Sequence, residues 1–165
     1  MNKKGFTLIE AVLYVGISSL VIFVISFFLV FLLQMNIKNQ TVAEIDSQGL
    51  FVMRLINQTI RNSAGVNSPI PGENNVALSL ETFDSLKNPT IFFEENGILY
   101  LKEGADERIP LTNSLVFLSE LFFENYSAAS SKDSINFSFI LSRINNSGRN
   151  EYDYSKKFYA ASSTR

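Results

Sequence analysis

Residues 3–33 read KKGFTLIEAVLYVGISSLVIFVISFFLVFLL, and the organisation of the whole chain follows from them. No charged residue occurs between Ala11 and Leu33. At about 1.5 Å of rise per residue, a helix over this run is long enough to cross the roughly 30 Å hydrocarbon layer of a bilayer. Soluble domains rarely bury a helix that is apolar on every side. The run is therefore predicted to be a membrane-spanning segment.

Charge predicts the orientation of this segment. Lys3 and Lys4 directly precede the apolar run, which keeps the N-terminus cytoplasmic and places everything after Leu33 outside the cytoplasm. A secretory signal is excluded because the run is too long and its small residue, Gly5, lies before it. A plain signal anchor fits the length. It gives no reason for Glu10, whose charge near a membrane costs a few kcal/mol.

The string KKGFTLIEAVLYVGISSL resembles the leader and helix start of type IV prepilins and type II secretion pseudopilins. That family has a short basic leader, a Gly before the cleavage point, a Phe after it and a Glu as fifth residue of the mature chain. Lys3-Lys4, Gly5, Phe6 and Glu10 match all four features. The resemblance implies that a prepilin peptidase in the membrane cuts between Gly5 and Phe6 and N-methylates Phe6.

Cleavage before Phe6 would create an α-amino group four residues ahead of Glu10. In a staggered filament, the amine of one subunit can pair with the Glu10 carboxylate of its neighbour, and a buried charge is tolerated when it is paired. Glu10 is then expected to set the register of assembly. The alternative is that Glu10 only marks the edge of the membrane segment, within snorkelling reach of the interface.

The resemblance implies other pilin or pseudopilin subunits, an inner-membrane assembly platform and membrane lipid as partners.

Composition restricts the chemistry. The chain has 165 residues and a formal net charge of −2. Without Lys3 and Lys4, 12 of the 14 basic residues remain against 16 acidic ones, giving −4, so nothing indicates nucleic-acid binding. Cys and His are both absent, which excludes disulfides, Ser–His and Cys–His triads and the commonest zinc sites. No enzyme activity and no cofactor are predicted.

The helix is expected to continue beyond the membrane, because residues 34–62 contain no Pro. Apolar or small residues recur there at three- and four-residue steps, forming a stripe that can pack on a globular domain: Val42, Ile45, Gly49, Val52, Met53, Ile56 and Ile60. A coiled-coil stalk is the alternative, although the stripe is short and irregular. Gly16 and Gly49 are candidates for weak points or close contacts. Residues 63–65 are expected to end the helix, with Gly65 as its C-terminal cap.

The remainder is predicted to be β-rich, after a loop over residues 67–75. Expected strands cover residues 76–80, 90–93, 98–102, 108–111, 115–124, 135–141 and 151–160, with a frayed tail at 162–165. Asn96-Gly97 predicts a hairpin and residues 103–106 a second turn.

The fold class is thus α+β, a long N-terminal helix packed against an antiparallel sheet. The parts are a leader (1–5), a membrane half (6–33) and an amphipathic half (34–63) of the helix, and an extracytoplasmic domain (64–165).

Several groups in the β region are candidate sites. The carboxylates Glu94, Glu95, Glu103, Asp106 and Glu107 suggest paired acids or a calcium site, but a solvated hairpin end is favoured. Four aromatic residues near the C-terminus suggest an adhesive surface, but ordinary strand packing is favoured: Tyr152, Tyr154, Phe158 and Tyr159. Lys132 and Asp133 lie on a long loop where a partner can dock. No role is assigned to the Asn125-Tyr126-Ser127 triplet.

The favoured function is a structural subunit of a filament resembling a type IV pilus or a type II secretion pseudopilus. The helix segment INQTIRNSAG (56–65) is similar to minor pseudopilins that initiate the filament or cap its tip; a major pilin is the nearest alternative. The expected location is the cytoplasmic membrane, with a single span, and after assembly an envelope-spanning or surface filament. A signal-anchored binding or sensory protein that never polymerises is the alternative from another class.

Overall fold

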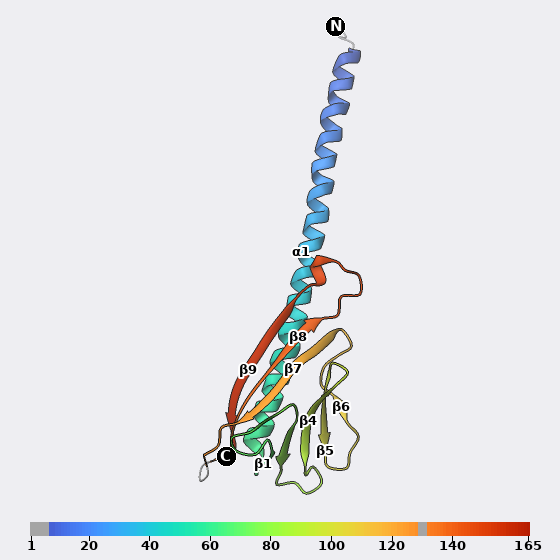
Figure 1. Cartoon of the computed structure of the whole chain (residues 1–165). Helices are drawn as coiled ribbons and strands as arrows, with labels where there is room; N and C mark the ends of the chain where they lie inside the picture. The colour runs from blue at the N-terminus through green and yellow to red at the C-terminus, as the bar shows by residue number, and fades with distance from the viewer. Residues whose placement is uncertain (1–6, 129–131) are drawn as a thin grey trace. The chain divides into compact units, whose positions relative to one another are not determined.

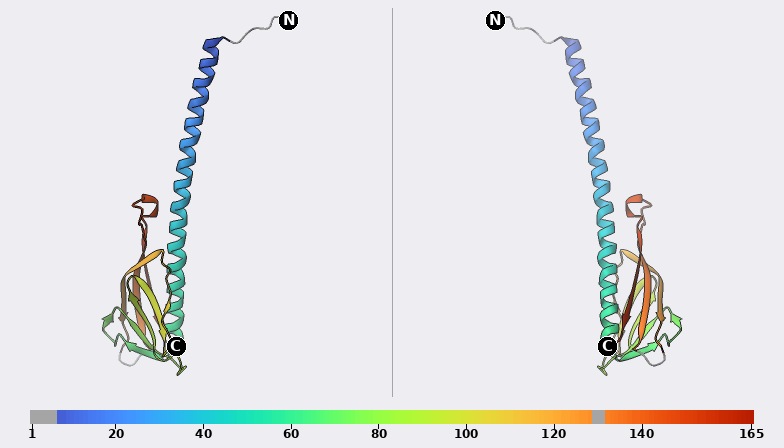
Figure 2. Two further views of the ribbon diagram at one scale, coloured as in Figure 1. Left: turned by 90° about the vertical axis from the view of Figure 1, so that its right-hand side faces the viewer. Right: turned by 90° about the vertical axis from the view of Figure 1, so that its left-hand side faces the viewer.

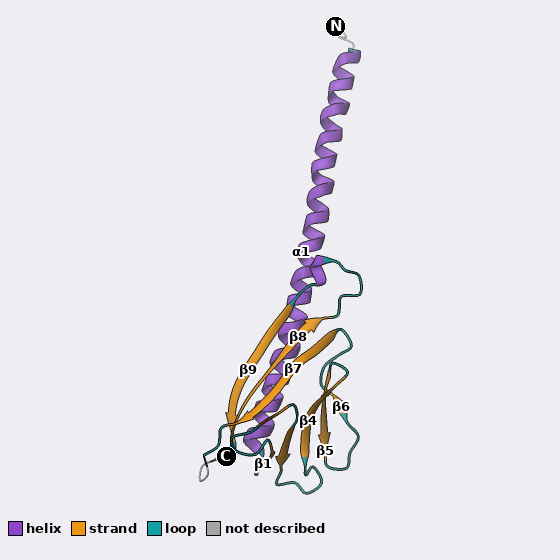
Figure 3. Ribbon diagram, viewed as in Figure 1, coloured by secondary structure: helices purple, strands orange, loops and turns teal. Residues whose placement is uncertain are grey.

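The computed structural model describes residues 7–128 and 132–165 (Figure 1). The chain divides into two compact units, Met1–Asn39 and Gln40–Arg165. One helix, α1 (Leu8–Asn62), contributes to both units. Its 55 residues agree with the predicted helix of more than fifty, and one side of its second half is buried. The fold class is therefore α+β, with a long N-terminal helix and antiparallel sheets (Figure 3).

The buried side of α1 repeats every three or four residues. The residues on it are Thr41, Ile45, Gly49, Val52, Ile56 and Ile60. Val42 and Met53, which were expected on the stripe, are half-buried at its margins. In the second unit the strands lie along one side of the helix (Figure 2). The period of the stripe thus predicted correctly which side of α1 packs on the β domain.

The strands form two antiparallel sheets, where the sequence had predicted one. The first sheet has the order β1 (Gly65–Ser68), β3 (Leu78–Glu81), β4 (Thr90–Glu95), β5 (Ile98–Glu103) and β6 (Ile109–Pro110). The second has the order β2 (Asn74–Asn75), β7 (Val116–Asn125), β8 (Ser134–Arg143) and β9 (Ser155–Ser163). After β6 the chain leaves the first sheet, and β7 pairs with β2 and β8 instead. Local hairpin signals carry no information on that change of sheet.

A single apolar core joins α1 to both sheets. Its largest fully buried side chains include four phenylalanines, Phe92, Phe123, Phe137 and Phe139. The predicted alternation in β8 is confirmed, because Ile135, Phe137, Phe139 and Leu141 all point into the core. The hairpin at Asn96-Gly97 is also confirmed: both residues have positive φ, as a tight two-residue turn requires.

The end of α1 differs from the expectation. The helix ends at Asn62, and the Ser63 hydroxyl donates to the Ile60 carbonyl at 2.7 Å. Gly65 is not a left-handed cap but the first residue of β1, where it pairs with Glu81. The extended backbone starts early because the Ala64 amide already donates to the Glu81 carbonyl. The predicted loop at 67–75 consequently contains the end of β1 and all of β2.

The C-terminal region also corrects two expectations. Residues 150–152 form a short 3-10 helix, η1 (Asn150–Tyr152), so the last strand begins at Ser155 and not at Glu151. The tail is not frayed, because β9 continues to Ser163 and Thr164 is buried. The Thr164 amide donates to the Asp133 carbonyl at 2.9 Å. The tail is ordered because residues 134–136 of β8 extend far enough to pair with it.

Candidate functional site

The predicted cleavage and methylation positions, Gly5 and Phe6, lie outside the described residues. The described part of the motif begins at Thr7, whose carbonyl accepts the backbone amides of Glu10 and Ala11, both at 3.1 Å. The Thr7 hydroxyl oxygen also lies 3.4 Å from the Glu10 amide nitrogen. Thr7-Leu8-Ile9-Glu10 has the spacing of a capping box. This spacing is visible in the sequence but is not among the predictions above, and it places the Glu10 charge at the positive end of the helix dipole.

The first unit exposes a helical surface that is apolar apart from Glu10 and a few small polar residues. Residues 8–33 are exposed on every side, and the helix is long and apolar enough to cross a membrane. The hydroxyls of Ser19 and Ser26 donate to the carbonyls of Gly16 and Ile22, at 2.9 and 2.8 Å. The hydrocarbon layer of a membrane contains no water, so polar groups in a spanning segment must form their hydrogen bonds within the protein. These observations are consistent with a membrane anchor.

Glu10 is the only charged residue in this surface, and among the described residues no cation pairs with it. The first basic residue after it in the sequence is Lys38, nearly eight helical turns away. Within the described ranges 7–128 and 132–165, none of the ion pairs involves Glu10. A cation that neutralises this carboxylate inside a membrane would have to come from the leader region or from another molecule.

The predicted carboxylate group does not converge on one point. Glu94 accepts the Gly97 amide within the hairpin turn, and Glu95 pairs with Arg108. Glu103 pairs with Lys87 at 3.1 Å. Among the described residues, no cluster of three or more potential metal ligands is found. Each of these three acids therefore stabilises its own turn or strand end.

The four C-terminal aromatic residues do not form one surface. Phe158 is buried and lies against Gly49 of α1, where an added Cβ would come 2.1 Å from the ring. Gly49 is thus a close-contact position, one of the two roles considered for it. Tyr152 lies in η1 near Arg143 and Arg149. Only Tyr159 is largely exposed.

The described residues on the two sides of the gap at 129–131 are tied to the domain by hydrogen bonds. The Asn125 side chain is buried and donates to the Pro69 carbonyl at 2.8 Å, so this residue has a structural role that the sequence analysis had not assigned. The Asp133 carboxylate accepts the Val66 amide at 2.9 Å. Asp133, which was considered for partner docking, is thereby engaged in holding β1.

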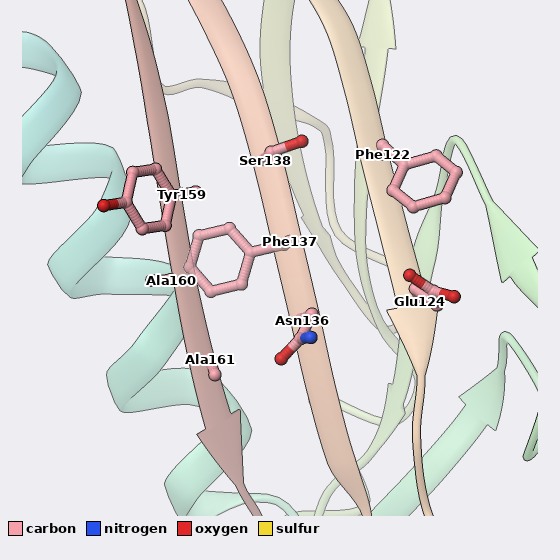
Figure 4. A pocket seen from close by; sticks show the side chains of 8 residues that line it. All are labelled: Phe122, Glu124, Asn136, Phe137, Ser138, Tyr159, Ala160 and Ala161. Carbon is pink, nitrogen blue, oxygen red and sulfur yellow. The ribbon is translucent and has the colours of Figure 1, made fainter.

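The outer face of the second sheet carries a shallow cavity of about 430 Å³ that the sequence analysis did not find. It lies over β7, β8 and β9, on the side opposite α1 (Figure 4). Exposed side chains of Phe122, Asn136 and Tyr159 line it, together with the half-buried Glu124 and Ser138. These residues come from three strands, and only the pairing register brings them together.

No protein-family model matches this chain, and no curated protein or solved structure shows a significant match to it.

Proposed function

We propose that this protein is a subunit of a filament resembling a type IV pilus or type II secretion pseudopilus, with a minor, initiating or tip position. The observation that carries the proposal is the solitary Glu10 at the start of a charge-free, fully exposed helical surface. A carboxylate in such a surface is costly unless a cation is supplied. The amine generated by cleavage before Phe6 of a neighbouring subunit would supply it.

The two units of the chain support the same proposal. The apolar surface of residues 8–33 can pack against lipid before assembly and against equivalent helices afterwards. The unit from Gln40 to Arg165 has its own core and needs no contribution from the apolar segment. A filament subunit requires this separation, because one part must change its surroundings while the other stays folded.

Mass spectrometry of the N-terminal peptide tests the pathway. The full chain is expressed in a host whose prepilin peptidase is active on a control substrate, and the membrane fraction is digested. The expected peptide begins at Phe6 and carries one additional methyl group. A peptide that begins at Met1 or Asn2 would contradict the proposal and favour an anchored protein that does not polymerise.

Substitution of Glu10 tests the register role separately from membrane insertion. Glu10→Ala should leave the protein in the membrane fraction but abolish its crosslinking to partner subunits, whereas Glu10→Asp should retain part of it. Thr7→Ala is the matched control, because it removes the helix cap and keeps the charge. If Glu10→Ala assembled like the wild type, Glu10 would not set the register.

A further inference from the structure

The cavity on the outer face of the second sheet is built from two parallel rows of side chains. Phe122 of β7 pairs with Ser138 of β8, and Ser138 pairs with Tyr159 of β9. The next row has Glu124, Asn136 and Ala161 in the same order: Glu124 pairs with Asn136 and Asn136 with Ala161. Figure 4 shows the small Ser138 between the two rings, with the second row beside them. The floor of the cavity is thus low in the middle and bordered by aromatic rings.

A β-bulge puts one of the rings on this face. Ser119 pairs with Ile140 and Phe122 with Ser138, so three steps along β7 correspond to two along β8. Glu120, inside the bulge, has a positive φ of 51°. Bulges commonly re-aim side chains next to binding sites. If the same residues alternated without a bulge, Phe122 would lie on the buried face with Val116 and Leu118, and the outer face would have only one of the two rings.

The rings are arranged as an open platform. Tyr159 is 80% exposed, and Figure 4 shows its ring and that of Phe122 largely face-on from outside the sheet. One strand separates β7 from β9, so the two rings are about two strand spacings apart, or about 9.6 Å. A platform of this length is too open to enclose a small molecule. It suits an extended ligand that contacts both rings.

The polar groups of the cavity lie beside the rings. The Asn136 amide can donate and accept, while the Glu124 carboxylate and the Ser138 hydroxyl accept hydrogen bonds. The Tyr126 phenol donates a hydrogen bond to the Glu124 carboxylate, which raises the pKa of the phenol above its usual value. Ala161 adds a small apolar surface at the end of the second row.

We propose that this face binds a β-1,4-linked glycan of N-acetylhexosamines. In such a chain alternate sugars present the same face, and their repeat is close to the separation of the two rings. The apolar faces of two alternate pyranoses would lie on Phe122 and Tyr159. An acetamido N–H would donate to Glu124 or Asn136, and its methyl group would contact Ala161. The proposal concerns the β domain and does not rest on filament assembly.

Isothermal titration of the full chain in lipid nanodiscs with chitohexaose tests the site, with empty nanodiscs as the blank. We expect saturable binding that Tyr159→Ala and Phe122→Ala each weaken at least tenfold. Phe83→Ala is the matched control, because Phe83 is an aromatic residue about as exposed as Tyr159, at 84%, in the loop after β3 and outside the cavity. Its affinity should stay within twofold of the wild type. Unfolding midpoints of all variants check that the fold is retained.

Other outcomes would overturn the proposal. Absence of saturable binding to chitohexaose, or unchanged binding by both ring variants, would remove the glycan site. Cellohexaose binding as tight as chitohexaose would overturn the assignment of the acetamido contacts. If sedimentation showed self-association that Tyr159→Ala abolishes, without glycan binding, the occupant would be a second copy of the chain.

Discussion

The two halves of α1 belong to one continuous helix and have opposite relations to their surroundings. Residues 11–33 carry no charge and are exposed on every side, while the stripe from Thr41 to Ile60 is buried in the same molecule. Polar and apolar residues are therefore sorted by face only in the second half. The apolar surface of the first half has no partner among the described residues of its own unit.

This difference identifies where each half obtains its stability. The second half is stabilised by packing within the chain, so substitutions there should change the free energy of unfolding of the β domain. The first half depends on lipid or on other helices, so substitutions there should change only insertion or assembly. Paired substitutions of the same residue type in the two halves can therefore test the comparison.

The largest effect is expected for a buried isoleucine. Ile56→Ala should lower the free energy of unfolding by about 2–5 kcal/mol, because Ile56 is completely buried and truncation leaves a cavity. Urea unfolding of the full chain in detergent micelles, followed by near-ultraviolet circular dichroism, measures it. Ile17→Ala is the matched variant in the first half, where the side chain is 55% exposed, and should leave the unfolding midpoint unchanged. Equal effects of the two variants would show that the apolar half also packs on the domain.

A smaller effect is expected for the two glycines of α1. Gly49→Ala should lower the free energy of unfolding of the domain. Overpacking costs about 1–3 kcal/mol. The better helix propensity of Ala offsets about 1 kcal/mol of that cost. Phe158 cannot easily move away, because it is buried and its ring is stacked on Phe139 at 5.3 Å. Gly16→Ala should cause no loss, because an added Cβ would meet no side chain and no other segment within 4 Å. The same urea titration compares the two variants.

The double variant Gly49→Ala with Phe158→Leu sharpens this test. A smaller side chain at 158 leaves room for the new methyl group, so the double variant should be more stable than the sum of its single changes predicts. Additive losses would mean that Gly49 is required for a reason other than the Phe158 ring.

Periodicity made most of the fold predictable, and its limits explain the errors. The all-apolar run, the stripe on α1 and the alternation in β8 are repeats along the chain, so sequence alone reveals them. The division into two sheets, the pairing of β1 and the order of the tail depend on contacts between distant segments. Gly65 illustrates this limit: its position favoured a helix cap, but pairing with Glu81 required extended backbone.

The two candidate sites differ in the same way. Glu10 is conspicuous in the sequence because a charge interrupts an apolar run, and Thr7 could have been recognised as its capping partner from their spacing. Phe122, Ser138 and Tyr159 share no pattern along the chain. Their juxtaposition depends on the register of three strands and on the bulge at Glu120. Tyr159 belongs to the group of four C-terminal aromatic residues in the sequence, and the other three do not line the cavity.

The smallest effect concerns the ion pair between Lys156 of β9 and Asp46 of α1, at 2.8 Å, which has no counterpart in the first half. The hydrogen bond to Asp46 raises the pKa of Lys156 above 10.5 in the folded protein. A raised pKa means that the pair stabilises the fold fully below the unfolded-state value and loses this contribution as pH rises through the folded-state value. The difference in urea midpoint between the wild type and Asp46→Asn should therefore be small at pH 8 and vanish at high pH; other groups that titrate in this range cancel in the comparison. Both side chains are partly exposed, so salt should also reduce the difference.

Lys156→Gln should reproduce the loss at pH 8, and adding Asp46→Asn to it should change nothing more. A larger loss in the double variant would show that Asp46 stabilises α1 independently of β9, which would weaken the view that the second half of the helix is held by its own domain.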